Sequence, residues 1–471
     1  MRGEGPNEEE SETTVGLGSD RHQKTAQAEL ALRGRGEAPR AQRSGESRPA
    51  VHGDERSGND GLMERVVERS NVEKALKRVK QNKGSPGVDG MKVDELAEHL
   101  TKHWKEIRAQ LLEGTYRPKE VRSVEIPKSG GGVRKLGIPT ALDRCIQQSI
   151  LQVLQPMVDP TFSQHSHGFR PGRRAHDAVC EAQRYIQSGK RVVVDVDLEQ
   201  FFDRVNHDVL MGRLEERIGD KRMLGLIRRY LEAGIMANGV VMERYEGTPQ
   251  GGPLSPLLAN VLLDEVDKEL EKRGLSFVRY ADDLNVYVKS KRAGERAMQT
   301  LRRLYGRLRL RINEAKSAVG RPWDRKFLGY SFWVAPGKTV RRKVSPKALE
   351  AMKERVRDIT SRNGGRSMKA VMAELRSYLE GWKQYFKLAD TPGVFKVLDE
   401  WIRHRLRQVQ LKQWKRGKTI YRELIRRGTA EDVARQVATH SRCWWRNSAM
   451  MLNVALPNTY FDAEGVPRLA N

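Results

Sequence analysis

The segment FVRYADDLNVYV, residues 277–288, places two adjacent carboxylates between short apolar runs. The flanking runs are rich in aromatic and β-branched residues, which are typical of β-strands. Asp282 and Asp283 repel each other and resist burial. We therefore expect Ala281, Asp282 and Asp283 to form the turn of a hairpin, where polar side chains remain accessible. Taken alone, the segment fits an ordinary turn better than a reactive site.

A second group of carboxylates lies in VVVDVDLEQFFDRVNH, residues 192–207. Asp195 and Asp197 are two residues apart, so both point to one face if the strand is regular. If Asp197 meets Asp282 and Asp283 in space, divalent metal relieves their repulsion. Three carboxylates suit two Mg²⁺ ions, which prefer oxygen ligands. Two such ions can activate a 3′-hydroxyl and stabilise a leaving pyrophosphate.

Two glycine-rich segments add possible nucleotide contacts. In GTPQGGPLSPLLANVLLDEVD, residues 247–267, small residues around Gln250 would let a nucleotide approach the backbone closely. In IPKSGGGVRKLGIP, residues 126–139, Lys128 and Arg134 flank the tip of a predicted hairpin. Cations on such a tip could hold a triphosphate. Each segment also fits a plainer interpretation, a loop before a helix and a solvated turn.

The charge of the chain indicates a polyanionic partner. The 471 residues include 87 Lys and Arg against 61 Asp and Glu, a net charge of +26. Residues 1–60 contain 9 basic and 12 acidic side chains, so the excess lies in the rest of the chain. Nucleic acid is the simplest partner, and a generally basic surface is the alternative. Three widely spaced cysteines, Cys145, Cys180 and Cys443, argue against a disulfide framework or a cysteine-based zinc site.

Composition and periodicity divide the chain into regions. Residues 1–60 have almost no aromatics and predict a disordered tail. Helical spacing follows over residues 62–84 and 93–112, and residues 116–333 mix strand-like runs with helices. After Val344 the pattern is helical, with 25 basic and 13 acidic residues. A buried helical stripe is predicted at Leu375, Tyr378, Leu379, Trp382 and Phe386.

Aromatic residues of the last region are interspersed with Arg and Lys, which could hold RNA by stacking and phosphate contacts. The tryptophans considered for this role are Trp401, Trp414, Trp444 and Trp445. Neither a membrane-spanning run nor a signal peptide is predicted, so a cytoplasmic location is expected.

The order of these motifs resembles that of the reverse transcriptases, and most closely the group II intron-encoded proteins, which combine reverse transcriptase and maturase. YADD is joined by HGFRPGRRAHDAV, DLEQFFDRVNH, GTPQGGPLSPLLANV and FLGYSFW, over about 400 residues from Leu62 onward. The resemblance implies an α/β (α+β) right-hand polymerase fold with fingers and palm, followed by an all-helical thumb/maturase domain. The implied parts are a disordered tail (1–60), an N-terminal extension (61–115), fingers and palm (116–335), a thumb/maturase domain (344–440) and a C-terminal segment (441–471).

The resemblance also implies roles for individual residues. Asp197, Asp282 and Asp283 resemble the catalytic carboxylates that hold two Mg²⁺ ions, and Asp195 becomes a neighbour. Phe202 resembles the aromatic residue that lies under the nucleotide sugar and excludes a 2′-hydroxyl. The remaining implied contacts are Lys128, Arg134, Gln250, Gly251 and Lys316 for the nucleotide and Leu328 and Gly329 for the primer.

The implied activity is that of an RNA-directed DNA polymerase, a nucleotidyltransferase that also helps its intron RNA to splice and to move by reverse splicing and cDNA synthesis. The implied partners are intron RNA in a ribonucleoprotein, an RNA template with a DNA primer, dNTPs and target DNA, with no membrane. A bacterial protein of this type is expected in the cytoplasm and at the nucleoid. Nothing resembles the His-Asn-His endonuclease of many relatives, so second-strand cleavage is expected to be absent.

Two alternatives stay open. The polymerase could be domesticated or serve a defence or CRISPR-associated system, although the basic helical region after Val344 favours the intron type. It could also be a non-catalytic RNA-binding splicing factor, although Asp197, Asp282 and Asp283 are all present. The intron subclass, the insertion site, the oligomeric state and the role of the tail do not follow from the sequence.

Overall fold

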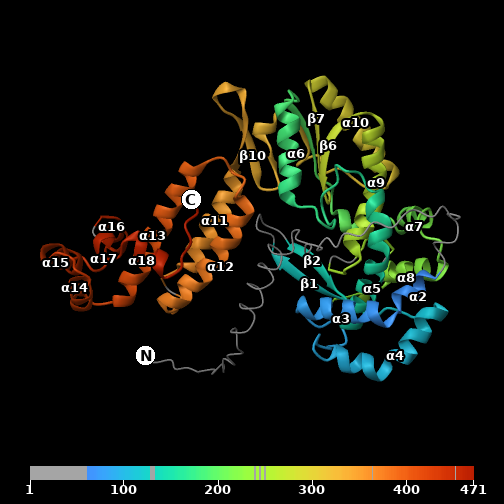
Figure 1. The fold of residues 1–471 in the computed structure, drawn as a ribbon, viewed down its shortest axis with the longest axis horizontal. Coiled ribbons are helices and arrows are strands. Elements are labelled where there is room, and N and C mark those ends of the chain that lie inside the picture. Colours follow the sequence, from blue (N-terminus) through green and yellow to red (C-terminus); the bar gives the residue numbers. More distant parts are fainter. Residues whose placement is uncertain are drawn as a thin grey trace, which may run out of the picture.

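The computed structural model describes residues 61–127, 133–237, 240–242, 245–248, 251–362, 364–450 and 452–470. Figure 1 shows a broad mixed α/β lobe and an elongated helical lobe that extends from one side of it. Each lobe is built around its own cluster of buried hydrophobic side chains. No described helix is long and apolar enough to cross a membrane.

The mixed lobe begins with helices that pack on one another. They are α2 (Leu62–Val66), α3 (Arg69–Gln81), α4 (Leu96–Glu113), α5 (Ala141–Val158), α7 (His207–Glu215) and α8 (Lys221–Glu232). The helix predicted over residues 62–84 is divided, because Glu68 has extended backbone angles and begins a new helix. Asp220 caps α8 and also accepts a hydrogen bond from the Met63 backbone nitrogen at 3.0 Å, which joins α2 to α8.

A four-stranded sheet lies beside these helices in the order β2-β1-β4-β5. Its strands are β1 (Val121–Pro127), β2 (Val133–Ile138), β4 (Ile235–Ala237) and β5 (Val240–Met242). β1 and β2 pair antiparallel, which confirms the predicted hairpin, whereas β1 and β4 pair in parallel. The tip of the hairpin, with Lys128, lies outside the described residues.

The central sheet has the order β6-β7-β3-β8 and carries the carboxylates. Its strands are β3 (Val192–Val196), β6 (Ser276–Tyr280), β7 (Asp283–Val288) and β8 (Ala318–Gly320). Val194 and Val286 on one face join the cluster of α9 (Ser255–Lys272) and α10 (Lys291–Arg307). Val193 and Tyr287 on the other face join the cluster that includes α6 (Ala175–Gln187). The sheet is therefore held between helices on both faces.

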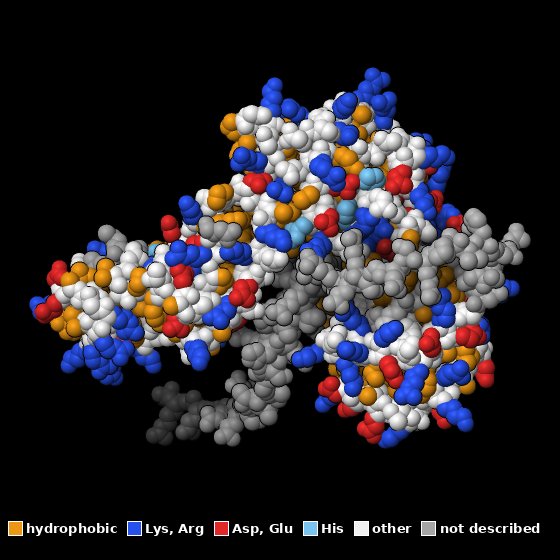
Figure 2. All heavy atoms as spheres, in the orientation of Figure 1, with side chains coloured by type: hydrophobic (Ala, Val, Ile, Leu, Met, Phe, Trp, Pro, Cys, Tyr) orange, Lys and Arg blue, Asp and Glu red, His pale blue; other side chains and the backbone are white. Residues whose placement is uncertain are grey.

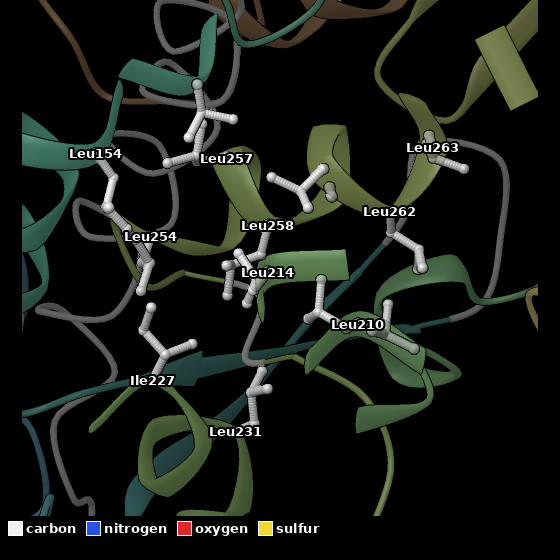
Figure 3. Packing of buried hydrophobic residues seen from close by; sticks show 14 of the residues in the cluster. Leu154, Leu210, Leu214, Ile227, Leu231, Leu254, Leu257, Leu258, Leu262 and Leu263 are labelled. Carbon is white, nitrogen blue, oxygen red and sulfur yellow. The ribbon is translucent and has the colours of Figure 1, made fainter. Parts of the chain in front are cut away.

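Leucine and isoleucine side chains of four helices meet beneath this sheet. Figure 3 shows Leu154 of α5, Leu214 of α7, Ile227 of α8 and Leu258 of α9 in one apolar layer, all almost fully buried. Packing of this kind makes the support of the central sheet rigid, because each side chain is surrounded by others at close-packed density.

A small sheet leads into the helical lobe. It contains β9 (Lys326–Phe327), β10 (Tyr330–Val334) and β11 (Val340–Val344). The helices that follow are α11 (Pro346–Ile359), α12 (Met368–Phe386), α13 (Pro392–Trp414), α14 (Gly417–Arg426), α15 (Glu431–Thr439), α16 (Trp444–Met450), α17 (Leu452–Ala455) and α18 (Asn458–Ala463). The predicted stripe on α12 is confirmed as core, with Tyr378 half-buried and its other members buried.

The end of the chain packs onto α13. The buried guanidinium of Arg403 pairs with Asp399 and with Asp462 of α18, at 3.1 and 2.8 Å. Asp399 also accepts a hydrogen bond from the Leu469 backbone nitrogen at 2.8 Å. The hydrophobic cluster of the helical lobe includes Phe461, so residues after 441 continue the packing of that lobe.

Candidate active site

The paired carboxylates lie at the hairpin that joins β6 and β7. Tyr280 pairs with Asp283, so the connecting loop consists of Ala281 and Asp282 alone. Ala281 is buried and has the left-handed φ of 57°, a conformation that tight hairpins require and that is uncommon for residues other than glycine. The predicted hairpin is confirmed, with one correction: Asp283 is the first residue of β7 and is not part of the turn.

The register of the central sheet brings the second carboxylate group to this hairpin. Val196 of β3 pairs with Leu284 of β7 in an antiparallel ladder. One residue further along, Asp197 stands next to Asp283 at the end of the two strands. Asp195 pairs with Asn285, so both lie on the same face as Asp197, as the two-residue spacing predicts.

Asp197 is held by its backbone, and its carboxylate faces a cation. Its backbone nitrogen donates to Ser317 Oγ at 3.0 Å, and its carbonyl accepts from the Asn313 nitrogen at 2.8 Å. Lys316 Nζ lies 3.3 Å from Asp197 Oδ2. The side chain of Asp197 is 34% exposed and that of Lys316 is 65% exposed, so both can reach a ligand.

These side chains fit a divalent cation by the chemistry of their donors. Asp197 and Asp283 supply carboxylate oxygens from adjacent strand ends, where Asp282 is half-buried and Asp283 is exposed. Among the described residues, no three His, Cys, Asp or Glu side chains are already gathered closely enough to hold an ion.

Asp195 belongs to the support of the site. Its side chain is mostly buried, and this burial raises its pKa to about 6. Arg325 Nη1 lies 4.0 Å from its carboxylate, and Asn285 Nδ2 donates to Oδ1 at 3.0 Å when the amide is oriented to satisfy both groups. These partners hold Asp195 beside Asp197.

A buried ion pair beneath the hairpin was missed by the sequence analysis. Arg279 and Asp267 are both fully buried, with Arg279 Nε 2.8 Å from Asp267 Oδ1 and Nη2 2.6 Å from Oδ2. Arg279 Nη1 also donates to Asn260 Oδ1 at 2.8 Å and to the carbonyl of Ala281 at 2.9 Å. The guanidinium thus links α9 to the turn that carries Asp282. A charged residue inside the apolar run FVRYA was the signal that could have revealed it.

The segment HGFRP covers the open edge of β6. The His167 backbone nitrogen donates to the Arg279 carbonyl at 2.8 Å, and Asn260 Nδ2 donates to the Gly168 carbonyl at 2.9 Å. A Cβ at Gly168 would lie 2.2 Å from the Ala281 nitrogen, so only glycine fits there. The resemblance drew attention to this segment, but its contact with the turn depends on tertiary structure.

The predicted nucleotide contacts are partly described. Phe202 is half-buried in a short 3₁₀ helix, Phe201–Asp203, and its carbonyl accepts from the Thr248 nitrogen at 2.6 Å. Gly251 approaches β2 so closely that a Cβ would lie 2.5 Å from the Gly137 oxygen. Hence the glycine segment runs between the Phe202 loop and the β1–β2 hairpin.

For three of the predicted nucleotide contacts, the position of the side chain is not described. Lys128 and Gln250 lie outside the described residues. Arg134 lies in β2, where its backbone pairs with Ile126.

The predicted primer contact is a two-residue turn between β9 and β10. Leu328 and Gly329 both have left-handed φ angles, 51° and 80°. Tyr385 Oη donates to the Leu328 carbonyl at 2.9 Å, and a Cβ at Gly329 would lie 3.2 Å from the ring of Phe386. The turn is therefore attached to α12, and a shift of the helical lobe would move it.

The aromatic side chains of the helical lobe are less exposed to solvent than the sequence suggested. Trp414 is buried and packs under Arg427, so its proposed role in stacking is wrong. Arg362 Cζ and Lys412 Nζ lie over the Trp444 ring, 4.7 and 4.6 Å from its centre. Trp445 is 46% exposed. Figure 2 shows Lys and Arg side chains spread over both lobes on the face displayed.

The chain matches two family models. Residues 126–332 match Reverse transcriptase (RNA-dependent DNA polymerase), and residues 349–428 match Group II intron, maturase-specific domain. Protein YkfC of Escherichia coli (strain K12) is 32% identical over 299 residues, which cover 55% of this chain and 78% of YkfC.

Intron-encoded proteins are also similar to this chain. Group II intron-encoded protein LtrA of Lactococcus lactis subsp. cremoris is 38% identical over 207 residues, 44% of this chain and 34% of LtrA. The putative COX1/OXI3 intron 2 protein of Saccharomyces cerevisiae is 34% identical over 203 residues, 42% of this chain and 23% of that protein. The matched regions thus make up about a third or less of these two relatives. The chain belongs to the group II intron reverse transcriptase/maturase family, whose members are RNA-directed DNA polymerases.

Proposed function

We propose that this protein copies RNA into DNA at the ends of β3 and β7, with Asp197, Asp282 and Asp283 holding two Mg²⁺ ions. The strand register carries the proposal, because it sets Asp197 next to Asp283 beside the hairpin tip. Adjacent carboxylates repel each other, a divalent cation between them relieves this repulsion, and Mg²⁺ prefers oxygen ligands.

The residues around the carboxylates have distinct roles in this proposal. When bound, the two ions supply activation of the primer 3′-hydroxyl and stabilisation of the leaving pyrophosphate. Lys316 partly neutralises Asp197 in the free protein and holds a phosphate oxygen of the incoming nucleotide in the complex. Phe202 lies under the sugar and excludes a 2′-hydroxyl. Further nucleotide contacts are assigned to Lys128, Arg134, Gln250 and Gly251.

The architecture supports a right-hand polymerase arrangement. Residues 61–115 form the N-terminal extension and residues 116–335 the fingers and palm, with the central sheet as the palm. Residues 344–440 form the thumb/maturase domain, and 441–471 the C-terminal segment. Leu328 and Gly329 hold the primer, because their turn is fixed between β10 and α12 where the two lobes meet.

The partners follow from the charge and from the helical lobe. The net charge of +26 favours binding of an RNA template with its DNA primer, of intron RNA and of target DNA. The basic surface of the helical lobe binds the intron RNA and assists its splicing and its later movement into DNA. Nucleotide selection and incorporation then belong to the mixed lobe.

Primer extension by the purified full chain tests the polymerase proposal. A labelled DNA primer annealed to an RNA template should be extended with dNTPs and Mg²⁺, and extension should stop when the ion is chelated. An intron precursor RNA, incubated with the protein at a Mg²⁺ concentration too low for self-splicing, should be spliced. Splicing without any primer extension would contradict the polymerase assignment and favour an RNA-binding splicing factor.

A further inference from the structure

A second polar recess lies on the mixed lobe, apart from the residues assigned to catalysis. It is open to solvent, has a volume of about 640 Å³, and is lined by side chains between Gln164 and Arg173, by α6 and by residues just after α6. His165, His167 and Glu181 form its inner part. No residue proposed to hold the metal ions, the nucleotide or the primer lines it.

Glu181 organises the inner part of this recess. Its side chain is only 8% exposed, and its two oxygens contact different imidazole rings: Oε1 lies 2.5 Å from His165 Nδ1, and Oε2 lies 2.6 Å from His167 Nε2. Tyr185 Oη also donates to Oε1 at 2.8 Å. Burial raises the pKa of Glu181, but the hydrogen bonds from these three side chains outweigh burial and lower it. The carboxylate therefore remains ionised and fixes both rings.

The two histidines leave hydrogen-bonding capacity that this network does not use. The side chain of His167 is 93% buried, since 7% of it is exposed, and its Nδ1 has no partner among the described residues. A buried polar atom without a partner is uncommon in folded proteins and points to a missing ligand or water. His165 is one-third exposed, and the hydrogen bond with Glu181 raises its pKa, so in the protonated form its other ring nitrogen can donate to an anion.

The rim of the recess is strongly basic. Arg173, Arg184 and Lys190 line it, and within the described chain none of the three forms an ion pair with a carboxylate. Lys190 Nζ lies 5.0 Å from the centre of the Tyr185 ring, which holds the ammonium group at the edge of the opening. Three cations therefore surround a site that contains one buried carboxylate, so the side chains that line the recess carry a net positive charge.

We infer that this recess binds a phosphate group of a nucleic acid strand outside the catalytic centre. Guanidinium and ammonium groups are the donors that phosphate oxygens accept from most strongly. A polynucleotide is favoured over a single small anion, because the recess is open to solvent and lies beside the segment that supports the catalytic turn. This assignment of the strand rests on the proposed copying of nucleic acid.

The position of the recess connects it to the polymerase site. The Arg279 backbone nitrogen donates to the His165 carbonyl at 2.9 Å, and Gly168 lies against Ala281. The segment that supplies both histidines therefore also supports the catalytic turn. A strand that is bound at the turn and continues over the segment that covers β6 would place a phosphate at the recess.

The test compares two double variants of the full chain. Arg184→Ala with Lys190→Ala removes two rim cations, and Arg292→Ala with Arg296→Ala removes two exposed arginines of α10 as the control. The Kd of a fluorescent primer–template is measured over a series of NaCl concentrations. We expect roughly tenfold weaker binding for the rim variant. Its slope of log Kd against log [NaCl] should be smaller by about 1 to 2, because one or two phosphate contacts are lost. The Kd of the control should stay within about twofold of wild type. Equal effects in both variants, or none in the rim variant, would overturn the inference.

A second arm distinguishes the source of the phosphate. Inorganic phosphate is added at constant ionic strength, and the Tm of wild type and of the rim variant is measured. A phosphate-dependent rise in Tm for wild type only, together with unchanged primer–template binding by the variant, would assign the recess to a free anion and overturn the nucleic acid assignment. Primer extension by wild type is measured in parallel. Its absence would contradict the proposed function, whereas the binding comparison alone decides the role of the recess.

Discussion

Arg279 donates from Nη1 to the carbonyl oxygen of Ala281 at 2.9 Å, from a side chain that is completely buried. The same guanidinium is paired with the buried carboxylate of Asp267. A buried cation of this kind is stable only with its partners in place, so the ion pair fixes the carbonyl that it bonds. The conformation of the hairpin tip is thereby linked to α9, which lies beneath the sheet.

Arg279→Met should lower both stability and activity. It leaves the charge of Asp267 buried without a partner, which costs about 3–5 kcal/mol in the free energy of unfolding. Adding Asp267→Leu should restore most of that stability, because an apolar pair can replace a buried ion pair at little cost. Primer extension should remain low in the double variant, because the Ala281 carbonyl still lacks its donor. Urea unfolding and single-turnover extension measure the two effects, and a double variant with wild-type extension would show that Arg279 has only a structural role.

Gly168→Ala should disturb the same turn from the opposite side. The added Cβ would lie 2.2 Å from the Ala281 nitrogen, so one of the two backbones must move. We expect a loss of about 1–3 kcal/mol in stability and at least a tenfold loss in extension rate. Gly212→Ala, on an exposed part of α7 with no atom near the new Cβ, is the matched control. It should stabilise the protein by up to about 1 kcal/mol and leave extension unchanged. Equal extension by both variants would refute the proposed support of the turn.

Glu181→Gln should lower stability in a pH-dependent manner. The hydrogen bond with Glu181 raises the pKa of His165 above 6.5. The stability that protonated His165 contributes is therefore fully present below pH 6.5 and is lost as the pH rises through the raised pKa. The pKa of Glu181 lies below 4.5, so its contribution is present above pH 4.5 and is lost only in stronger acid. The difference between wild type and variant should therefore be largest between pH 4.5 and 6.5 and smaller above that range. A pH-independent difference in urea unfolding would contradict the charged interaction.

Lys316→Ala should affect catalysis far more than stability. The pair of Lys316 with Asp197 is largely exposed, and such pairs contribute about 0–1 kcal/mol. We expect a 10- to 100-fold lower kcat for nucleotide incorporation, because the substitution removes a cation that stabilises the charge of the phosphates in the transition state. Lys291→Ala, at the exposed start of α10, is the control and should behave as wild type. Steady-state kinetics and thermal unfolding distinguish a catalytic effect from a structural one.

Much of the fold could be predicted because local pattern and tertiary packing agree. The apolar runs around Asp282 and Asp283 specify two strands, and the stripe of α12 specifies a buried helical face. The first and last residues of each helix or strand are harder to predict from the sequence. Asp283 joined the strand because its backbone pairs with Tyr280, and that pairing depends on the conformation of Ala281.

The support of the site could not be predicted in the same way. Arg279, Asp267 and Asn260 are brought together by the packing of α9 under the sheet, and no short motif records that contact. The Glu181 network likewise joins α6 to a segment outside it. Trp414 shows the opposite error, since its basic neighbours in sequence suggested exposure whereas it is buried at the end of α13.

The most direct test of the central claim is the single-turnover incorporation of one dNTP by Asp197→Asn and by Asp283→Asn, with saturating primer–template and Mg²⁺. Each substitution keeps the size of the side chain and removes one metal-binding charge. Asp94→Asn, at an exposed position far from the hairpin in sequence, is the control. Two-metal catalysis at the ends of β3 and β7 predicts at least a thousandfold loss for both variants and a wild-type rate for the control. Incorporation by either variant within about twofold of wild type would contradict the assignment.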